Sequence, residues 1–210
     1  MKYLLFLLFP WVLQAQNPEL TFKRLVQKFN QVKSYDVVAT IKPQIPLIRI
    51  LPVKANIHFS YPSNFQVQSA GISILPKNGF SELPLLFSKP DDFTAIASGM
   101  ENSFEIITLL PKQNDSNIIL AKIWVDASSL LVVKSQITSR SNGTITCEFD
   151  YNQEKTWGLP AHMKFVMDVN KFKIPKGLAT DINRTSRPAE TDAKSKKGTI
   201  DVYFKKYKVN

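Results

Sequence analysis

Residues 118–151, IILAKIWVDASSLLVVKSQITSRSNGTITCEFDY, decide the fold class of this chain. Ile118–Val125 and Leu130–Ser139 are two strand-like apolar runs separated by a short polar turn. Asn142-Gly143 is a strong hairpin signal, and apolar and polar side chains alternate after it. Three successive strands with short connections predict an antiparallel meander rather than a parallel sheet with crossover helices.

Similar alternation extends from this stretch toward both ends of the chain. The side chains expected to share one face of a strand are Tyr35, Val37, Ala39 and Ile41; Ile57, Phe59 and Tyr61; Phe65 and Val67; Met163, Phe165, Met167 and Val169; and those of a last strand over residues 200–209. The run 104–110 is apolar on both faces, as is typical of a central strand. With about ten strands and no internal repeat, residues 16–210 are expected to form one mainly β (α+β) domain around a curved or closed sheet.

One amphipathic helix is predicted ahead of the strands, over Pro18–Lys33. Its apolar residues Phe22, Leu25, Val26, Phe29 and Val32 recur at helical spacing, and basic and amide side chains lie opposite them. Asn17 is placed to cap this helix, and a proline suits its first turn.

The first fifteen residues have the layout of a secretory signal peptide. Lys2 gives a positive start, residues 3–13 are almost wholly apolar, and Ala15 is the small residue of a cleavage site. The apolar run is too short to span a membrane, which takes ~20 residues, and Pro10 argues against a buried core helix. We expect cleavage after Ala15 and a soluble protein outside the cytoplasm, with no cysteine near the cut to carry a lipid anchor.

The formal net charge is strongly positive, at +10. A basic cytoplasmic protein would suggest a nucleic-acid partner, but an exported protein meets little nucleic acid, and the lysines here are spread along alternating segments. Anionic lipid head groups or acidic proteins are partners that fit this charge, and a merely well-solvated surface fits it too. We therefore expect no nucleic-acid partner.

Few residues suit catalysis or metal binding. Cys147, the one cysteine, lies on the apolar side of an alternating run, which predicts a core thiol and excludes an internal disulfide. His58 and His162 fall in separate strands, and neither HExxH nor CxxC spacing occurs. Asp91-Asp92 follows a proline and predicts a turn or a helix cap. We expect no enzyme activity, no metal and no cofactor.

Two connecting segments differ from the rest of the chain. Pro43–Pro52 holds aliphatic side chains between prolines that interrupt regular pairing, so it either packs over the core or faces a lipid or a partner. Pro175–Gly198 is polar and rich in basic residues, which predicts a mobile loop or a basic docking arm.

The order of these features resembles the LolA superfamily of periplasmic lipoprotein carriers. A signal peptide and one helix precede sequential strands in both. The motifs that carry the resemblance are Val32-Lys33-Ser34-Tyr35, residues 59–65 (FSYPSNF), Trp124-Val125-Asp126 followed by LLVVK at 130–134, Gly158-Leu159-Pro160, and the closing residues 198–210. The last two resemble a branch of lipoprotein-sorting proteins. The likeness covers most of the chain that follows the signal peptide, through short motifs.

The resemblance implies a strongly curved antiparallel half-barrel whose apolar concave face is covered by helices. In the carriers this cavity shields the acyl chains of a lipoprotein on its way to the outer membrane, because exposing them to water costs ~0.8 kcal/mol per CH₂. The side chains expected to line it here are Phe59, Phe65, Val67, Phe104, Ile106, Trp124 and Phe149. Residues 83–93 are expected to form a short helix or lid, with Tyr61, Leu86 and Phe87 as lid or latch residues.

One position departs from the family pattern. The carriers generally place a basic residue before the proline that aligns with Pro62, where it bonds to backbone carbonyls of the lid. Tyr61 stands there in this chain, and a hydroxyl donates one hydrogen bond where a guanidinium has five donors. The resemblance therefore implies the cavity more directly than it implies the latch.

Three functional hypotheses follow from the sequence. The first is a periplasmic carrier or binding protein, expected to be a monomer, for lipid, acyl chains or lipidated proteins. The alternative is a sensor or interaction module on the same fold that binds an envelope protein. An enzyme comes last, with Asp92, His58 and His162 as its candidate residues.

Overall fold

The computed structural model describes residues 17–46, 51–62, 64–69, 84, 86–141, 143–168 and 197–210. The predicted signal peptide, residues 175–196 of the predicted basic loop, residues 47–50 of the apolar segment and Asn142 lie outside these described residues. Within them, no helix is long and apolar enough to cross a membrane.

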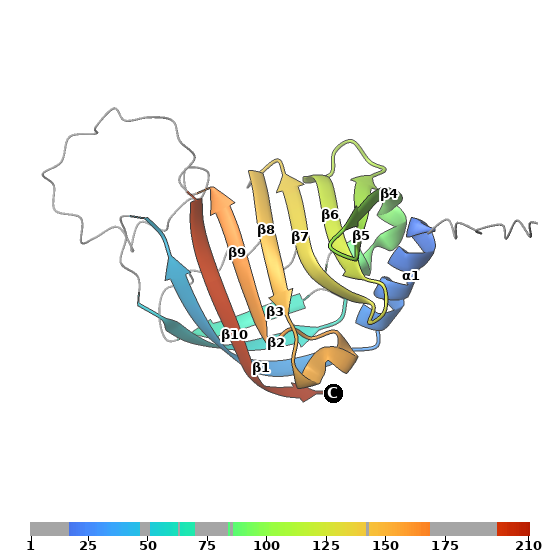
Figure 1. Cartoon of the computed structure of the whole chain (residues 1–210). Helices are drawn as coiled ribbons and strands as arrows, with labels where there is room; N and C mark the ends of the chain where they lie inside the picture. The colour runs from blue at the N-terminus through green and yellow to red at the C-terminus, as the bar shows by residue number, and fades with distance from the viewer. Residues whose placement is uncertain are drawn as a thin grey trace, which may run out of the picture.

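Ten antiparallel strands form one open, curved sheet, as predicted (Figure 1). The elements are α1 (Pro18–Phe29), β1 (Ser34–Gln44), β2 (Val53–Ser60), β3 (Asn64–Ser69), η1 (Pro90–Asp92), β4 (Phe93–Glu101), β5 (Phe104–Pro111), β6 (Ile118–Asp126), β7 (Leu131–Ser139), β8 (Gly143–Asp150), η2 (Gln153–Trp157), β9 (His162–Asp168) and β10 (Lys197–Val209). Their order in the sheet is β3-β2-β1-β10-β9-β8-β7-β6-β5-β4. The architecture is therefore the mainly β half-barrel that the sequence predicts.

Two meanders make up the sheet, and the pair β1–β10 joins them. Every neighbouring pair except this one is consecutive in the chain. In the joining pair Ala39 faces Phe204 and Ile41 faces Val202, so apolar side chains continue across the seam on one face. This pairing brings the first and last strands together in the interior of the sheet.

Helix α1 packs against the end of the sheet that holds β4 (Figure 1). The Asn17 side chain caps it as expected, with its Oδ1 accepting from the backbone N–H of Glu19 at 3.1 Å and of Leu20 at 3.2 Å. The helix ends at Phe29, four residues before the predicted end. Val32 is nevertheless buried, because the chain turns there to enter β1.

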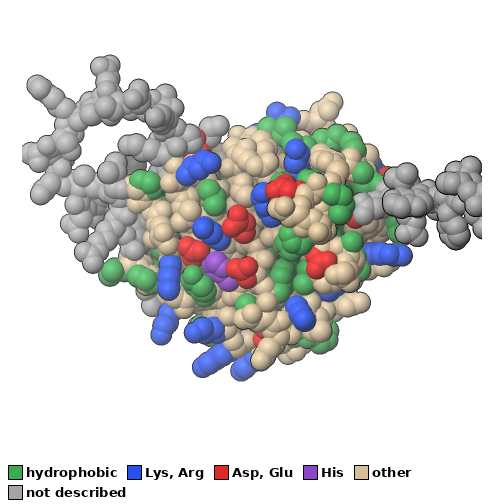
Figure 2. Space-filling model, in the orientation of Figure 1, with side chains coloured by type: hydrophobic (Ala, Val, Ile, Leu, Met, Phe, Trp, Pro, Cys, Tyr) green, Lys and Arg blue, Asp and Glu red, His purple; other side chains and the backbone are tan. Residues whose placement is uncertain are grey.

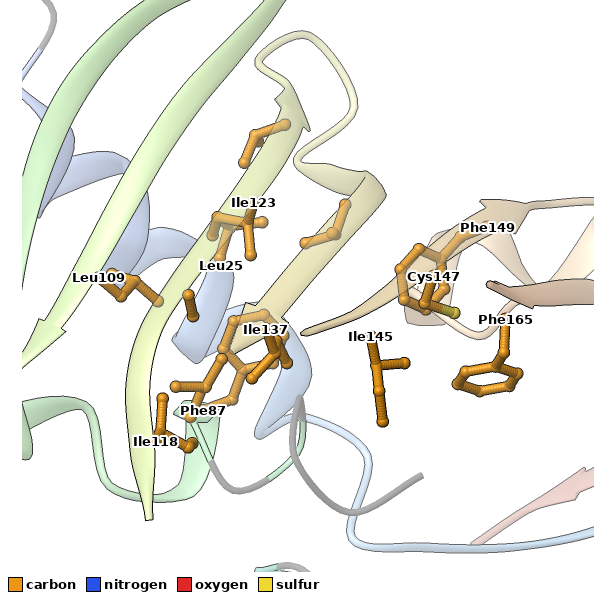
Figure 3. Close-up of a cluster of buried hydrophobic side chains, with 14 of the residues drawn as sticks. Leu25, Phe87, Leu109, Ile118, Ile123, Ile137, Ile145, Cys147, Phe149 and Phe165 are labelled. Carbon is orange, nitrogen blue, oxygen red and sulfur yellow. The ribbon is translucent and has the colours of Figure 1, made fainter. Parts of the chain in front are cut away.

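The core lies on the concave face, between the sheet and α1. Figure 3 shows Leu25 of α1 and Phe87 together with concave-face side chains of β5 to β9. Ile107, Leu109 and Ile123 have no exposed surface, and Phe165 has 1 %. Cys147 is a buried core thiol, as its position in the alternation predicts.

The structure differs from the sequence analysis at two strands. Pro43 and Gln44 were expected in an irregular apolar loop, but they continue β1 and pair with Ile200 and Thr199. Pairing of β1 with β2 ends at Ile41, so the proline falls where β1 has a single neighbour, a position that tolerates a missing N–H. Strand β4 was not located by the sequence analysis, since its small residues give little apolar alternation.

Candidate functional site

An apolar cavity lies between the concave face of the sheet, α1 and the helical residues 84 and 86–88. Its volume is about 100 Å³. The lining residues are Leu25, Lys28, Phe29, Tyr35, Phe65, Pro84, Phe87, Leu130, Leu131, Val132, Ser135, Ile137, Ile145, Cys147, Phe149, Tyr151, Gly158, Leu159, Pro160, Met163, Phe165, Phe204 and Tyr207. Strands from both halves of the sheet contribute, so the curvature of the sheet creates the cavity.

Two segments on the open side cover this cavity. Phe87 packs against Phe22 and Phe29 of α1, with ring centroids 6.1 and 5.2 Å apart. Polar contacts near both ends of α1 connect this helix to the sheet. Thr21 Oγ1 donates to Glu105 Oε2 at 3.2 Å, and Lys28 Nζ donates to the Ser129 carbonyl at 2.7 Å. Residues 86–88 therefore form the short helix expected within 83–93, and they cover the cavity together with α1.

Most polar groups of the cavity walls are uncharged or already make a hydrogen bond. Tyr151 and Tyr207 donate their hydroxyl protons to the carbonyls of Val132 and Pro160 at 2.8 and 2.7 Å. Burial raises the pKa of Tyr35, Tyr151, Tyr207 and Cys147, so these groups are uncharged at neutral pH. The cavity is consequently a low-dielectric space.

Phe65 and Phe149, two of the seven predicted lining residues, face this cavity. Phe59 lies on the same face, but Phe29, Tyr35 and Phe65 surround its ring at 5.9, 5.1 and 4.9 Å. Its exposed fraction is 1 %, so it packs beneath the residues that line the cavity.

Val67 takes the remaining concave position among the predicted residues, near the edge of the sheet. From β3 it pairs with Ile57 of β2, and it is 40 % exposed, outside the cavity.

Phe104, Ile106 and Trp124 do not line the cavity, contrary to the expectation. Ile106 pairs with Trp124 across β5 and β6, whereas the neighbouring pair Ile107 and Ile123 points into the concave core. Successive side chains of a strand point to opposite faces. All three predicted residues therefore lie on the convex face.

The convex surroundings of Trp124 explain how a large ring is buried there. Its Nε1 donates to Glu101 Oε2 at 2.8 Å, and Lys134 Nζ lies 4.3 Å from the ring centroid. The strand 104–110 is apolar on both faces, so the sequence pattern does not reveal which set of residues faces inward.

Of the predicted lid and latch residues, Leu86 and Phe87 are buried under the cover, and Tyr61 is not part of it. The Tyr61 backbone N–H donates to the Lys33 carbonyl at 2.8 Å, and Lys33 Nζ lies over its ring at 4.5 Å. The side chain is 40 % exposed. No hydrogen bond from its hydroxyl to the lid is present among the described residues.

The sequence pattern does not identify the lining residues that come from loops and from β10. Leu130, Leu159 and Pro160 lie in connections, and Phe204 and Tyr207 belong to β10. The alternation in the last strand and the Gly158-Leu159-Pro160 motif were recognised, but neither shows that the chain folds back onto the cavity.

The candidate catalytic residues are not brought together. His58 and His162 lie on β2 and β9, which β1 and β10 separate, and Asp92 is in η1. His162 Nδ1 lies 2.8 Å from Asp150 Oδ2, and its Nε2 lies 2.9 Å from Asp201 Oδ1. Both nitrogens are thus engaged in holding β8, β9 and β10 together. No group of three or more metal-ligating side chains occurs among the residues that the structure describes.

A comparison with protein-family models gives no match to this chain, and a comparison with the curated proteins gives none either. Solved structures do match. A LolA superfamily protein from Nitrosomonas europaea superposes with a TM-score of 0.56 at 11% identity, covering 90% of this chain and 93% of that one. The chain has the LolA fold. The resemblance inferred from short motifs is confirmed at this level.

Two further structures show the same LolA fold. One is a DUF1329 family protein from Desulfovibrio piger, with a TM-score of 0.55 and 11% identity over 93% of this chain and 94% of that one. The other is a proposed outer membrane lipoprotein-sorting domain from Vibrio parahaemolyticus, with a TM-score of 0.54 and 8% identity over 92% of this chain and 94% of that one. At such identities the likeness concerns the backbone architecture.

Proposed function

We propose that the protein is a periplasmic carrier or binding protein that shields an acyl chain, of a lipid or of a lipidated protein, in the cavity under α1. The observation that carries this proposal is the composition of the cavity wall. Among the described lining residues one side chain, Lys28, is charged, and aromatic and aliphatic side chains make up most of the rest. Each methylene moved from water into such a wall gains about 0.8 kcal/mol.

On this proposal, the small volume corresponds to a closed state of the cavity. A cavity of about 100 Å³ is well below the ~300–1,000 Å³ of pockets that enclose a drug-sized ligand. Ligand entry therefore requires α1 and residues 86–88 to move away from the sheet. The contacts of Phe87 with Phe22 and Phe29 would move with them, since all three rings belong to the cover.

The fold and the N-terminal sequence support this proposal. The Vibrio domain is named for lipoprotein sorting, and the Nitrosomonas protein is a LolA superfamily protein. The signal-peptide layout of residues 1–15 suits a protein that acts outside the cytoplasm. A role in delivery to the outer membrane belongs to the same proposal.

The first test is native mass spectrometry with organic extraction on protein purified from a bacterial periplasm. We expect co-purified phospholipid or acylated peptide that is released on denaturation. A clean ligand-free mass, with no uptake of added lipid or lipopeptide, would contradict the proposal. It would favour an interaction module whose concave face is filled by its own side chains.

A matched pair of variants tests the location of the ligand. Phe65→Asp places a carboxylate in the cavity wall, and Ile106→Asp places one on the convex face of the same sheet. We expect Phe65→Asp to abolish lipid binding and Ile106→Asp to retain it, with both variants folded by circular dichroism. Equal binding by the two variants would exclude this cavity as the site.

A further inference from the structure

Lys28 is the single charged side chain among the described residues that line the cavity. It projects from the last turn of α1 and is half-buried. Its stem lies beside η2, since a Cβ added to Gly158 would be 3.8 Å from Lys28 Cε. Its ammonium therefore stands where α1, the β6–β7 turn and the end of η2 meet.

The ammonium has little compensation from protein groups. Nζ donates to the Ser129 carbonyl at 2.7 Å, and no carboxylate oxygen of the described residues lies within 4.0 Å of it. A lysine ammonium has three donors. Two of them are therefore available at the edge of an apolar space.

Asp126 is the acidic residue that acts on Lys28 electrostatically, but its carboxylate is already engaged. Oδ1 accepts from the Ser128 backbone N–H at 2.9 Å and from its hydroxyl at 2.6 Å, and Oδ2 accepts from the Ser129 hydroxyl at 2.8 Å. Burial lowers the pKa of Lys28 and outweighs the opposing effect of Asp126. The surroundings thus leave the positive charge under-stabilised, which an incoming anion would correct.

We propose that the cavity takes a single-chain amphiphile with an anionic head, a carboxylate or a phosphate, whose head binds Lys28 while its chain lies against Phe87, Phe149 and Phe165. This inference rests on the proposed function, because it needs the chain to occupy the cavity. Charge-assisted hydrogen bonds are roughly twice as strong as neutral ones, and a low-dielectric site strengthens them further. The small closed volume suits one chain better than several.

A purely structural role for Lys28 makes a different prediction. A basic residue in the last turn of a helix stabilises the helix dipole, and the bond to Ser129 ties α1 to the sheet. Removing such an interaction lowers stability and changes the binding of charged and uncharged ligands alike. Discrimination between two ligands with the same chain and different heads separates the two roles.

The experiment is isothermal titration of the delipidated protein with dodecanoate and dodecyl phosphate below their micellar concentrations and with 1-dodecanol below its solubility limit. We expect wild type to bind at least one of the two anions about tenfold more tightly than the alcohol. Lys28→Met should remove this preference and leave the affinity for the alcohol unchanged, and Lys28→Arg should keep it. Lys23→Met, on the exposed side of α1, is the matched control and should behave as wild type.

The outcomes separate this inference from the proposed function. Equal affinity for anions and alcohol in wild type, or an anion preference that survives Lys28→Met, would overturn the role of Lys28 and leave the apolar cavity intact. Failure of wild type to bind any of the three would overturn both. Retained binding of 1-dodecanol by Lys28→Met serves as the check that the variant is folded. The ratio of dodecanoate to dodecyl phosphate affinity assigns the head group.

Discussion

The two faces of the sheet are built from the same strands and have opposite chemistry. On the concave face apolar side chains meet α1, and the residues around the cavity include one charge, that of Lys28. On the convex face, polar pairs such as Asp36 with His58 and Asp150 with His162 lie across neighbouring strands. Figure 2 shows a histidine flanked by acidic side chains among scattered basic ones. The difference supports the concave face as the proposed binding surface, whereas the polar pairs of the convex face connect neighbouring strands.

The largest expected effect is a difference in stability between two variants, each of which loses an aromatic ring on one face of the sheet. Phe165→Ala removes a concave side chain with 1 % exposure and should lower the free energy of unfolding by about 3–5 kcal/mol. Tyr203→Ala on the convex face, where the ring is 36 % exposed and stacks on His162, should cost no more than about 1 kcal/mol. Urea unfolding measures both, and similar losses would remove the contrast between the faces.

Replacing Glu105 and replacing Glu101 should change the free energy of unfolding in opposite directions. Glu105 is 2 % exposed on the concave side, and its Oε1 has no hydrogen-bond partner. Glu105→Met loses the hydrogen bond from Thr21 to Oε2 but removes a buried carboxylate with an unsatisfied oxygen, so the free energy of unfolding should rise by about 1 kcal/mol. Glu101→Met should lower it, since Trp124 Nε1 loses its acceptor. A decrease for both variants in thermal or urea unfolding would show that Glu105 is stabilising where it stands.

The thiol of Cys147 reports on access to the cavity. Burial raises its pKa, so less thiolate is present at pH 8 than in an exposed cysteine, and alkylation should be slow. The rate should increase as the pH rises toward the elevated pKa, and it should fall when a ligand fills the cavity. Iodoacetamide labelling followed by mass spectrometry measures the rate. Labelling as fast as that of a free peptide thiol would mean that the cover is open in solution.

The smallest expected effect concerns the convex contact between Lys134 and Trp124. The ammonium lies 4.3 Å from the ring centroid, and Lys134→Met should lower the free energy of unfolding by about 0.5–1 kcal/mol. Lipid binding should not change, because neither residue lines the cavity. An altered lipid affinity with normal stability would show that the convex face takes part in function.

The sequence predicts most of the secondary structure because alternation and capping are local properties. Asn17, the turn after Asp126 and the alternating strand after Gly143 all lie where the pattern places them. The local sequence shows which side chains of a strand point toward the core only where one face of the strand is polar. Strand β5 is apolar on both faces, so Ile106 and Ile107 could not be told apart without the packing of α1.

The cavity itself depends on contacts that the sequence pattern does not contain. Tyr207 and Leu130 are separated by 77 positions in the numbering and line one space only because β10 crosses to pair with β1. Glu105 and Lys28 are of residue types that usually lie on the surface, and their burial depends on where α1 lies. Long-range placement therefore decides the site, whereas local pattern decides the elements.

The open sheet leaves two edge strands, β3 and β4, and their irregularity has a consequence for solubility. β3 has six residues, and β4 carries a bulge between Ala97 and Met100, where Gly99 takes a φ of 98° that other residues rarely adopt. Long, flat edges recruit further strands from other chains and begin aggregation, whereas short or bulged edges do not. The short and bulged edges thus protect this open sheet against stacking with its own copies.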